Sequence, residues 1–406
     1  MKKHECDDVL LLSGIYPEYM YKKLTDHHFN KNVQIAADVL QKHIISGLEA
    51  SMSKPVKLIN APYMGVFPRS SRIVRLKLRS FSHSCDANDT DIPFWNIPLI
   101  RHFSIYNNAK AEIKRWVKDH PNGTIMAYAL TLRNVWGLLY AKKLSGSIKT
   151  CMIVPDMPLY MRLSANPIYK ICKRMENNAI CRHLHQIDSF VLLTESMNDI
   201  IKSRNHCVVE GIATSFESDR TEDPLSQIIL YSGTLDKRYG IDNLLQAFQK
   251  IDSKNARLYI CGVGDGQEIV EKTARHDERI CYMGLVPRNE IIRLQKSAAV
   301  LVNPRQNIGE YTKYSFPSKN LEYLSSGTPL VAYKLDGIPD EYDAYIHYVK
   351  DNTVEALKNT IEQVLNASPQ ERYARGEAAR QFVLNNKNET VQARKILDML
   401  NRIETC

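Results

Sequence analysis

Residues 315–332 have the sequence Ser-Phe-Pro-Ser-Lys-Asn-Leu-Glu-Tyr-Leu-Ser-Ser-Gly-Thr-Pro-Leu-Val-Ala. Pro317 and Ser318 favour the start of a helix, which the Ser318 hydroxyl can cap, and Gly327 favours its end. The apolar residues at 329–332 then predict a buried strand. A helix that leads directly into a buried strand is the repeating unit of a doubly wound α/β sheet.

The same alternation extends through the second half of the chain. Short apolar runs, most of them closed by glycine or proline, predict buried strands at 227–232, 257–261, 279–283 and 298–303. Helical spacing separates them at 241–251, 267–275 and 289–297. Three further helices are predicted at 355–365, 369–384 and 389–403. Strands joined by helices argue for a parallel sheet covered on both faces.

The first half follows the same pattern less regularly. Its apolar runs predict strands at 9–12, 124–128, 150–154, 189–193 and 207–210. We therefore predict an α/β protein with two Rossmann-like, doubly wound parallel-sheet domains. Residues 1–212 form the first domain, 213–384 the second, and 385–406 a helix that packs back on the first. Ligands of such sheets bind beyond the carboxyl ends of the strands, so facing domains would place a reaction in the cleft between them.

Composition narrows the class of protein. The chain has 406 residues, 44% apolar and 24% charged, which suits a soluble protein of two domains. No apolar run is long enough to span a membrane, and the start lacks the core of a signal peptide. The nine cysteines are scattered and form no Cys-x-x-Cys pair, so the sequence predicts neither disulfides nor a zinc site. These features favour the cytoplasm.

Charge is uneven along the chain. Residues 1–212 carry 29 Lys+Arg against 18 Asp+Glu, a net +11, whereas residues 213–406 carry a net −2. A basic half suggests anionic partners. If residues 69–79 form one strand, Arg75, Lys77 and Arg79 share a face. That face is either simply solvated or a patch that rests on a membrane surface or a lipid-diphosphate acceptor.

The first segment also suggests an anion site. The backbone N–H groups after Ser318 can face a phosphate, and Lys319 adds positive charge at the same end. Glu322, one turn further on, is placed to accept hydrogen bonds from a ribose diol. Without other signals, an ordinary capped helix with a solvated Lys and Glu would explain these residues equally well. Gly233 after one strand, and the loop at 262–266 after the next, add positions where backbone can approach a phosphate.

These segments, in this order, resemble the donor-binding half of the family-4 glycosyltransferases with GT-B fold. The resemblance is close over residues 227–345 and nearest to bacterial members that build capsule, exopolysaccharide or O-antigen. The first half is similar mainly through Pro155-Asp156-Met-Pro158. The resemblance implies a retaining, metal-independent transfer from a nucleotide diphosphate sugar, with UDP as the favoured nucleotide, to a lipid-linked or saccharide acceptor. It implies no cofactor and no nucleic-acid partner. Composition and charge suggest a cytoplasmic protein, with contact between the basic first domain and the inner face of the cell membrane as one option.

The resemblance also implies residue roles. Lys319 and Asp156 would be catalytic, although Asp156 is explained equally well as a turn residue between two prolines. The residues implied in donor binding are Gly14, Gly233, Thr234, Lys237, Arg238, Gly262, Gly264, Val286, Tyr314, Ser315, Phe316, Pro317, Ser318, Lys319, Asn320, Leu321 and Glu322. The sequence departs from the family where Tyr314 replaces the first glutamate of the Glu-x7-Glu motif. Thr234 and Tyr239 also replace the usual Arg and Lys, so that Lys237, Arg238 or Lys319 must supply the charge.

The sequence leaves three other functions open. A sugar-nucleotide epimerase has the same architecture but needs several carboxylates and a histidine around one sugar. An NAD-dependent oxidoreductase is disfavoured, because the loop at 262–266 lacks the Gly-x-Gly-x-x-Gly spacing. A non-catalytic partner subunit is kept open by Tyr314.

Overall fold

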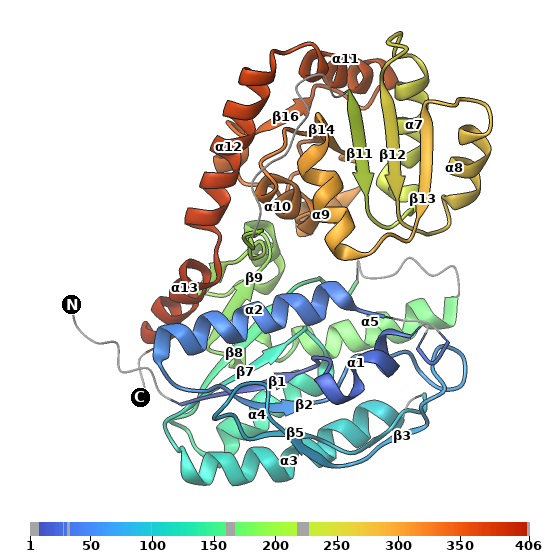
Figure 1. Ribbon diagram of the computed structural model, residues 1–406. Helices are drawn as coiled ribbons and strands as arrows, with labels where there is room; N and C mark the ends of the chain where they lie inside the picture. Colours follow the sequence, from blue (N-terminus) through green and yellow to red (C-terminus); the bar gives the residue numbers. More distant parts are fainter. Residues whose placement is uncertain are drawn as a thin grey trace. The chain divides into compact units, whose positions relative to one another are not determined.

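The computed structural model describes residues 8–26, 28–30, 33–98, 100–159, 167–216 and 227–403. The chain divides into two compact units (Figure 1). Unit 1 comprises residues 1–212 and 389–406, and unit 2 comprises residues 213–388. No helix within the described residues is long and apolar enough to cross a membrane.

Unit 1 is built on an eight-stranded sheet in the order β10-β9-β8-β7-β1-β2-β5-β4. All neighbours are parallel except β4 and β5. The strands are β1 (Val9–Ser13), β2 (Lys57–Asn60), β4 (Arg79–Phe81), β5 (Asp89–Asp91), β7 (Thr124–Tyr128), β8 (Lys149–Val154), β9 (Ser189–Leu192) and β10 (His206–Val208). A separate antiparallel pair is formed by β3 (Arg75–Leu76) and β6 (Phe94–Trp95). The central strands are buried along their whole length, as expected for a parallel sheet covered on both faces.

Helices cover both faces of this sheet (Figure 1). The α-helices of unit 1 are α1 (Glu18–Thr25), α2 (Ile35–Met52), α3 (Ile100–Asp119), α4 (Leu132–Leu144), α5 (Pro167–Cys181), α6 (Asn198–Ile201) and α13 (Glu389–Asn401). Two 3-10 helices, η1 (Leu184–Gln186) and η2 (Glu195–Met197), flank β9.

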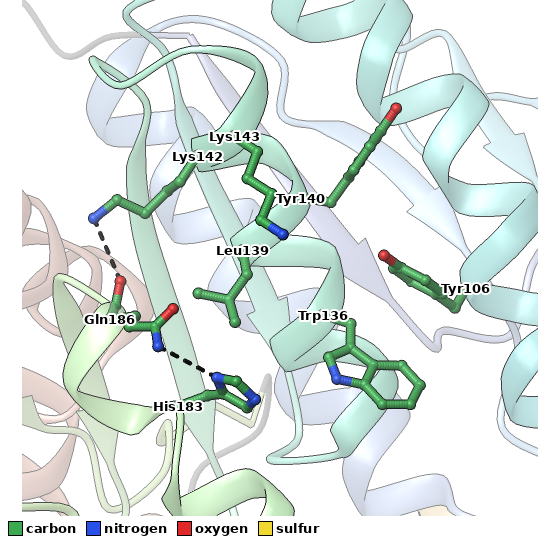
Figure 2. Close-up of a pocket in the computed structure, with 8 residues that line it drawn as sticks. All are labelled: Tyr106, Trp136, Leu139, Tyr140, Lys142, Lys143, His183 and Gln186. Carbon is green, nitrogen blue, oxygen red and sulfur yellow. Dashed lines mark hydrogen bonds between the residues drawn. The ribbon is translucent and has the colours of Figure 1, made fainter.

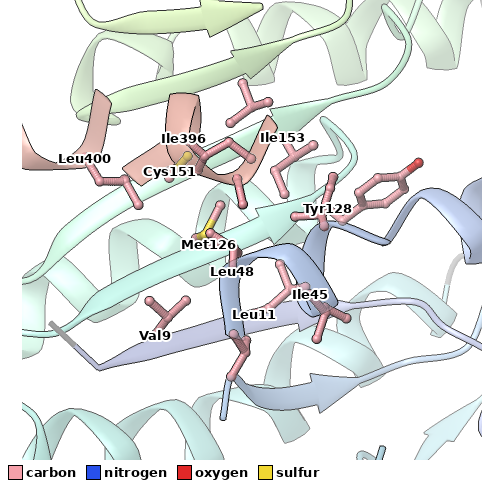
Figure 3. Packing of buried hydrophobic residues seen from close by; sticks show 14 of the residues in the cluster. Val9, Leu11, Ile45, Leu48, Met126, Tyr128, Cys151, Ile153, Ile396 and Leu400 are labelled. Carbon is pink, nitrogen blue, oxygen red and sulfur yellow. The ribbon is translucent and has the colours of Figure 1, made fainter. Parts of the chain in front are cut away.

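The core of unit 1 explains why α13, from the far end of the sequence, belongs to this unit. Alternate residues of β1, β7 and β8 point to the face covered by α2 and α13, where Ile396 and Leu400 complete the cluster (Figure 3). Gly47 of α2 permits the close approach, since a Cβ there would lie 2.4 Å from the carbonyl oxygen of Glu389. Each of these buried side chains contributes on the order of 1.5–3 kcal/mol.

The single strand predicted at 69–79 is wrong. The chain instead forms β3 and β4, which belong to different sheets: Arg75 pairs with Trp95, and Arg79 pairs with Asp91. Val74 and Leu78 are exposed rather than buried. The alternating pattern suggested one buried face, but cross-strand partners supplied by residues 89–95 divide the segment in two.

A partly buried polar cluster joins the end of α2 to the β4–β5 hairpin. His83 places Nδ1 2.6 Å from Asp89 Oδ2 and Nε2 2.9 Å from Glu49 Oε1. Burial alone would lower the pKa of His83, but the two carboxylates raise it to about 9. His83 therefore carries a proton at neutral pH and bridges two acidic side chains.

This cluster predicts a pH-dependent contribution to stability. A histidine whose folded-state pKa is raised stabilises the fold fully below its unfolded value of 6.5, and the stabilisation is lost as pH rises through about 9. We expect His83→Gln to lower the free energy of unfolding by ~1–3 kcal/mol at pH 6, with a smaller difference at pH 10. Urea unfolding at several pH values measures this. The exposed His276→Gln is the control, and a difference that grows with pH would contradict the assignment.

Unit 2 contains a six-stranded, wholly parallel sheet in the order β13-β12-β11-β14-β15-β16. Its strands are β11 (Ile228–Ser232), β12 (Arg257–Cys261), β13 (Ile280–Gly284), β14 (Val300–Asn303), β15 (Leu330–Tyr333) and β16 (Ile346–Val349). Its α-helices are α7 (Ile241–Gln249), α8 (Gln267–Ala274), α9 (Arg288–Ser297), α10 (Ser318–Ser325), α11 (Val354–Leu365) and α12 (Pro369–Asn386). Three 3-10 helices are η3 (Lys237–Tyr239), η4 (Glu310–Tyr314) and η5 (Asp340–Tyr342). The two parallel-sheet units confirm the predicted α/β fold class.

Candidate active site

The loops that follow β11 and β12 lie against each other at the carboxyl edge of the unit 2 sheet. The amide of Gly233 donates to the carbonyl of Cys261 at 2.9 Å, and that of Leu235 donates to Val263 at 3.0 Å. A Cβ on Gly262 would lie 1.8 Å from the carbonyl oxygen of Gly233, and its φ of +133° disfavours any L side chain. Because Gly262 cannot carry a side chain at this contact, the two loops meet there through bare backbone.

Helix α10 is fixed to the same edge by polar contacts. The Tyr323 hydroxyl accepts from the Ser232 amide at 2.8 Å and donates to the Ser232 carbonyl at 3.0 Å. The Asn303 side chain, at the end of β14, donates to Asn320 Oδ1 at 2.6 Å. The start of α10 is therefore held beside the ends of β11 and β14, the two central strands.

The N-terminus of α10 differs from the prediction in one respect. Pro317 occupies the N-cap position and Ser318 is the first helical residue, so the Ser318 hydroxyl does not cap the helix. Pro317 fixes the backbone but offers no side-chain acceptor. Within the part of the chain that the structure describes, no side chain caps this helix. The first backbone N–H groups of α10 thus remain able to hold an anion.

Glu322 and Lys319 form a half-buried ion pair one turn into α10. Lys319 Nζ lies 3.0 Å and 3.2 Å from the two Glu322 carboxylate oxygens, and Gln295 of α9 donates to Glu322 Oε1 at 2.6 Å. Burial alone raises the pKa of Glu322, but the Lys319 ammonium and the Gln295 amide hold it below its usual range. Glu322 is therefore an ionised acceptor whose position is set from two sides.

Arg305 is a cation of this edge that the sequence did not single out. It follows β14, and its guanidinium stacks on the rings of Tyr239 and Tyr311, each at 5.2 Å. Its Nη2 donates to the Ser315 hydroxyl at 2.8 Å, on the segment that enters α10. One signal was present: Tyr239 occupies the position of the usual lysine, and the structure places Arg305 against that ring.

The other proposed cations of the β11 loop differ in how exposed their charge is. Arg238 is tied to Asp236, with its Nε 2.9 Å from Oδ1, and this pairing holds the pKa of Asp236 below its usual range. Lys237 is exposed, and its backbone amide donates to Asp265 at 2.9 Å. Thr234 is exposed, and its carbonyl accepts from the Tyr231 hydroxyl. Arg238 thus has much of its charge neutralised, whereas Lys237 faces solvent.

The remaining predicted donor residues of unit 2 fall into two groups. Phe316 and Leu321 are buried, and Phe316 packs on Tyr342 with ring centroids 5.3 Å apart. Their role in the structure is to anchor α10. Gly264, Val286 and Tyr314 are exposed or half-buried on the loops after β12, β13 and β14. The structure thus brings three loops and the start of α10 together at one edge.

Two predicted residues lie in unit 1. Asp156 is exposed and follows the carboxyl end of β8 by two residues, and it contributes to the raised pKa of the buried Tyr128. Gly14 follows β1 but is buried, with its amide donating to Gln41 Oε1 at 2.9 Å and its carbonyl accepting from Tyr63. Asp156 is accessible at the sheet edge, whereas the Gly14 amide already has an acceptor.

Metal binding was not expected from the sequence. Among the described residues, no group of three or more His, Cys, Asp or Glu side chains is placed to hold a metal ion.

The part of the chain that forms this site matches a known protein family. Residues 215–382 match the family Glycosyl transferases group 1. This match covers nearly all of unit 2, including both glycine loops, Arg305 and α10. No curated protein matches the chain significantly in sequence.

Three solved structures with a similar fold carry a sugar, a sugar nucleotide or a sugar-transferring enzyme in their descriptions. S. aureus TarM, in complex with fondaparinux, alpha-GlcNAc-glycerol and UDP, has a TM-score of 0.53 at 12% identity; the match covers 76% of this chain and only 60% of TarM. The lipopolysaccharide outer core galactosyltransferase WaaB has a TM-score of 0.61 at 13% identity, and the match covers 97% of this chain and 99% of WaaB. The E. coli trehalose-6-phosphate structure bound with UDP-2-fluoro glucose has a TM-score of 0.65 at 10% identity, and the match covers 98% of this chain and 100% of the E. coli chain.

These similarities define a class. The two α/β units have the GT-B architecture, as predicted, and residues 215–382 form a glycosyltransferase group 1 domain. Residues 215–382 therefore have both the fold and the sequence pattern of a glycosyltransferase domain, which transfers a sugar to an acceptor.

Proposed function

We propose that the chain transfers a sugar from a nucleotide diphosphate sugar, with UDP as the nucleotide, and that the donor binds at the carboxyl edge of unit 2. The observation that carries this proposal is the start of α10, where uncapped backbone amides lie on the same helix turn as Lys319 and beside the segment held by Arg305. Amides at a helix N-terminus and fixed cations stabilise a diphosphate.

Different residues at this edge contact different parts of the donor. The bare backbone around Gly233 and Gly262 permits the nucleotide to approach closely. The ionised, positioned carboxylate of Glu322 accepts hydrogen bonds from the ribose diol. Lys319 and Arg305 lie where negative charge develops on the leaving diphosphate, so they stabilise the transition state more than the ground state. Arg305 supplies the charge that Thr234 and Tyr239 do not.

Two structures with similar folds support UDP as the nucleotide. S. aureus TarM was solved with UDP, and the E. coli trehalose-6-phosphate structure with UDP-2-fluoro glucose. A thermal-shift panel of UDP-, GDP- and ADP-sugars tests this choice. Stabilisation by UDP-sugars alone is the expected result, and stabilisation by GDP- or ADP-sugars alone would contradict it.

Replacing Lys319 tests the site itself. We expect Lys319→Ala to weaken UDP-sugar binding by ~1–3 kcal/mol, because it removes a charge-assisted hydrogen bond to the diphosphate. Isothermal titration measures the change. Lys254→Ala is a matched control, because Lys254 is an exposed lysine in the loop before β12, at the opposite edge of the sheet. Equal affinity in the two variants would place the donor elsewhere.

We further propose that transfer is metal-independent and retains the anomeric configuration. The helix amides, Lys319 and Arg305 stabilise the charge of the leaving diphosphate, which a divalent cation does in other transferases. EDTA is therefore expected to leave the initial rate of transfer unchanged. A rate that falls in EDTA and returns on addition of Mg²⁺ or Mn²⁺ would refute this mechanism, and an inverted anomeric signal in the NMR spectrum of the product would refute retention.

Asp156 is the proposed acceptor-side residue. It is exposed at the carboxyl edge of the unit 1 sheet, the edge at which ligands of such sheets bind. A carboxylate there can orient or deprotonate an acceptor hydroxyl. The proposed acceptor is a lipid-linked or saccharide intermediate of bacterial surface polysaccharide such as capsule, exopolysaccharide or O-antigen.

A surface patch of unit 1 with exposed apolar and basic side chains favours the proposal that the acceptor is lipid-linked. Leu78 is 62% exposed, next to exposed Lys77 and Arg79, while Arg75 stacks on the exposed ring of Trp95 at 4.8 Å. Apolar side chains among cations suit an anionic membrane surface. Co-sedimentation with anionic vesicles, but not with neutral ones, is the expected result. Retention of binding after Arg75, Lys77 and Arg79 are replaced by glutamine would exclude this patch.

Tyr314 favours one alternative, a non-catalytic partner subunit, because it replaces the first glutamate of the family motif. Turnover of a labelled UDP-sugar by the purified chain separates the two functions. Release of free epimerised sugar would instead favour a GT-B-fold epimerase.

A further inference from the structure

A pocket in unit 1 is lined by residues that take no part in the proposed donor and acceptor sites. It has a volume of about 590 Å³ and is lined by Tyr106, Trp136, Leu139, Tyr140, Lys142, Lys143, His183 and Gln186. Figure 2 shows these side chains, which come from α3, α4, η1 and the residue just before η1. A volume of this size suits a small ligand.

The charged end of the pocket lies towards the amino edge of the sheet, whereas the proposed acceptor residue Asp156 lies at the carboxyl edge. Lys142 and Lys143 are in the last turn of α4, and the following Ser145 donates to the carbonyl of Pro121 at 2.8 Å, just before β7 begins. Lys142 Nζ also contacts Asp188 at 2.5 Å, just before β9 begins. Lys142 and Lys143 therefore lie away from Asp156, whereas Tyr106, which also lines a small cavity with Ser13 and Tyr128, extends the pocket towards the carboxyl edge.

The aromatic side chains give the pocket one apolar wall. The rings of Tyr106 and Trp136 have centroids 5.5 Å apart at an angle of 57°, so each exposes part of a face or edge to the cavity. Phe103, 57% exposed, extends this wall 6.0 Å from Trp136. Aromatic faces of this kind stack against the apolar C–H face of a sugar ring while the hydroxyls of the sugar point outwards.

The opposite wall carries positive charge and hydrogen-bonding groups. Lys142 is neutralised by Asp188, but the ammonium of Lys143 forms no ion pair with any residue in the described ranges, and Figure 2 shows it directed into the pocket. His183 and Gln186 lie 3.3 Å apart, Nδ1 to Nε2. Among the described residues that line the pocket, none is acidic. The charge of the site is complementary to an anion.

We propose that this pocket binds an acidic saccharide, with a sugar ring stacked on Trp136 and Tyr106 and its carboxylate or phosphate held by Lys143. A concave site with hydroxyl, amide and imidazole groups favours a sugar over a flat membrane surface, which would need no such cavity. In a glycosyltransferase, such a site would hold a growing acidic glycan on the enzyme while its end is extended elsewhere. The proposal does not depend on the donor assignment in unit 2.

Binding of defined oligosaccharides to the full chain tests the proposal. The probe is a tetrasaccharide of alternating glucuronate and N-acetylglucosamine, and the comparison is its neutral, carboxyl-reduced counterpart. We expect the acidic probe to quench tryptophan fluorescence with an affinity at least about tenfold above that of the neutral one. Lys143→Gln should remove this preference, and Trp136→Phe should remove the quenching that accompanies binding.

Controls separate this site from general charge and from the donor site. Lys114→Gln makes the same charge change at an exposed position of α3 and should leave the acidic probe bound normally. Thermal stabilisation by UDP should be equal in all variants, whether or not UDP is the donor nucleotide. Equal losses in Lys143→Gln and Lys114→Gln, or no binding of the acidic probe at millimolar concentration, would overturn the proposal. Binding of anionic lipid vesicles that requires Lys143, without saccharide binding, would assign the pocket to a membrane instead.

Discussion

Replacing Arg305 by methionine is expected to lower the transfer rate by about 10²- to 10³-fold, the loss observed when one fixed donor to a developing negative charge is removed. The guanidinium is held by two tyrosine rings and by Ser315, so it needs little reorganisation when the diphosphate leaves. Methionine preserves much of the side-chain volume but carries no charge. Steady-state kinetics with the UDP-sugar measure the effect.

The design of this test separates chemistry from local folding. Arg238→Met removes the same charge from the neighbouring loop, but Arg238 is already paired with Asp236, so its loss should reduce the rate less than about tenfold. The affinities for UDP and for uridine should diverge in Arg305→Met, because only UDP has the diphosphate. Equal weakening of both ligands would show that Arg305 merely holds the loop, and unchanged kinetics would remove it from the site.

Gly262→Ala is expected to destabilise unit 2 and to abolish binding of the donor. A Cβ at this position would lie 1.8 Å from the carbonyl oxygen of Gly233, which is backbone and cannot rotate away. The residue also has a φ of +133°, and holding an L residue in such a conformation costs ~1–3 kcal/mol by itself. Separation of the two loops adds to this loss. Calorimetry should show a lower Tm, and isothermal titration should show no UDP binding.

Gly284→Ala is the matched control for this substitution. Gly284 also has a positive φ, of +63°, but a Cβ there would meet nothing within 4 Å. It therefore carries backbone strain without the clash between loops. We expect a smaller fall in Tm than in Gly262→Ala and preserved UDP binding. Similar behaviour of the two variants would mean that strain, rather than the contact between Gly233 and Gly262, governs the site.

Much of unit 2 could be predicted because its signals are local. Each of the strands predicted before residue 340 is a short apolar run bounded by turn residues, and the parallel arrangement follows from the helices between them. The candidate residues Gly233, Gly262, Lys319 and Glu322 follow from the same logic, since ligands gather where parallel strands end. The structure brings these four positions to one edge of the sheet.

Other features depended on partners far away in the sequence. Arg305 acquires its place from Tyr239 and Tyr311, neither of which is adjacent to it, so no local pattern marks it. The Gly14 amide is occupied because Gln41 lies on a helix that packs over it. The segment at 69–79 is split because residues 89–95 pair with its two ends in different sheets.

The sequence by itself determined the α/β class, the alternation of strands and helices in unit 2 as far as β15, and the residue types of the site, because periodicity and turn chemistry act over a few neighbouring residues. It did not predict β16 (Ile346–Val349), which pairs with β15. Only the tertiary structure decided which cations remain available. Arg238 pairs with Asp236 within one loop, and Lys319 pairs with Glu322 within one helical turn. The stacking of Arg305 on Tyr239 joins two different loops, so it depends on a distance that is fixed only when the strands are ordered side by side.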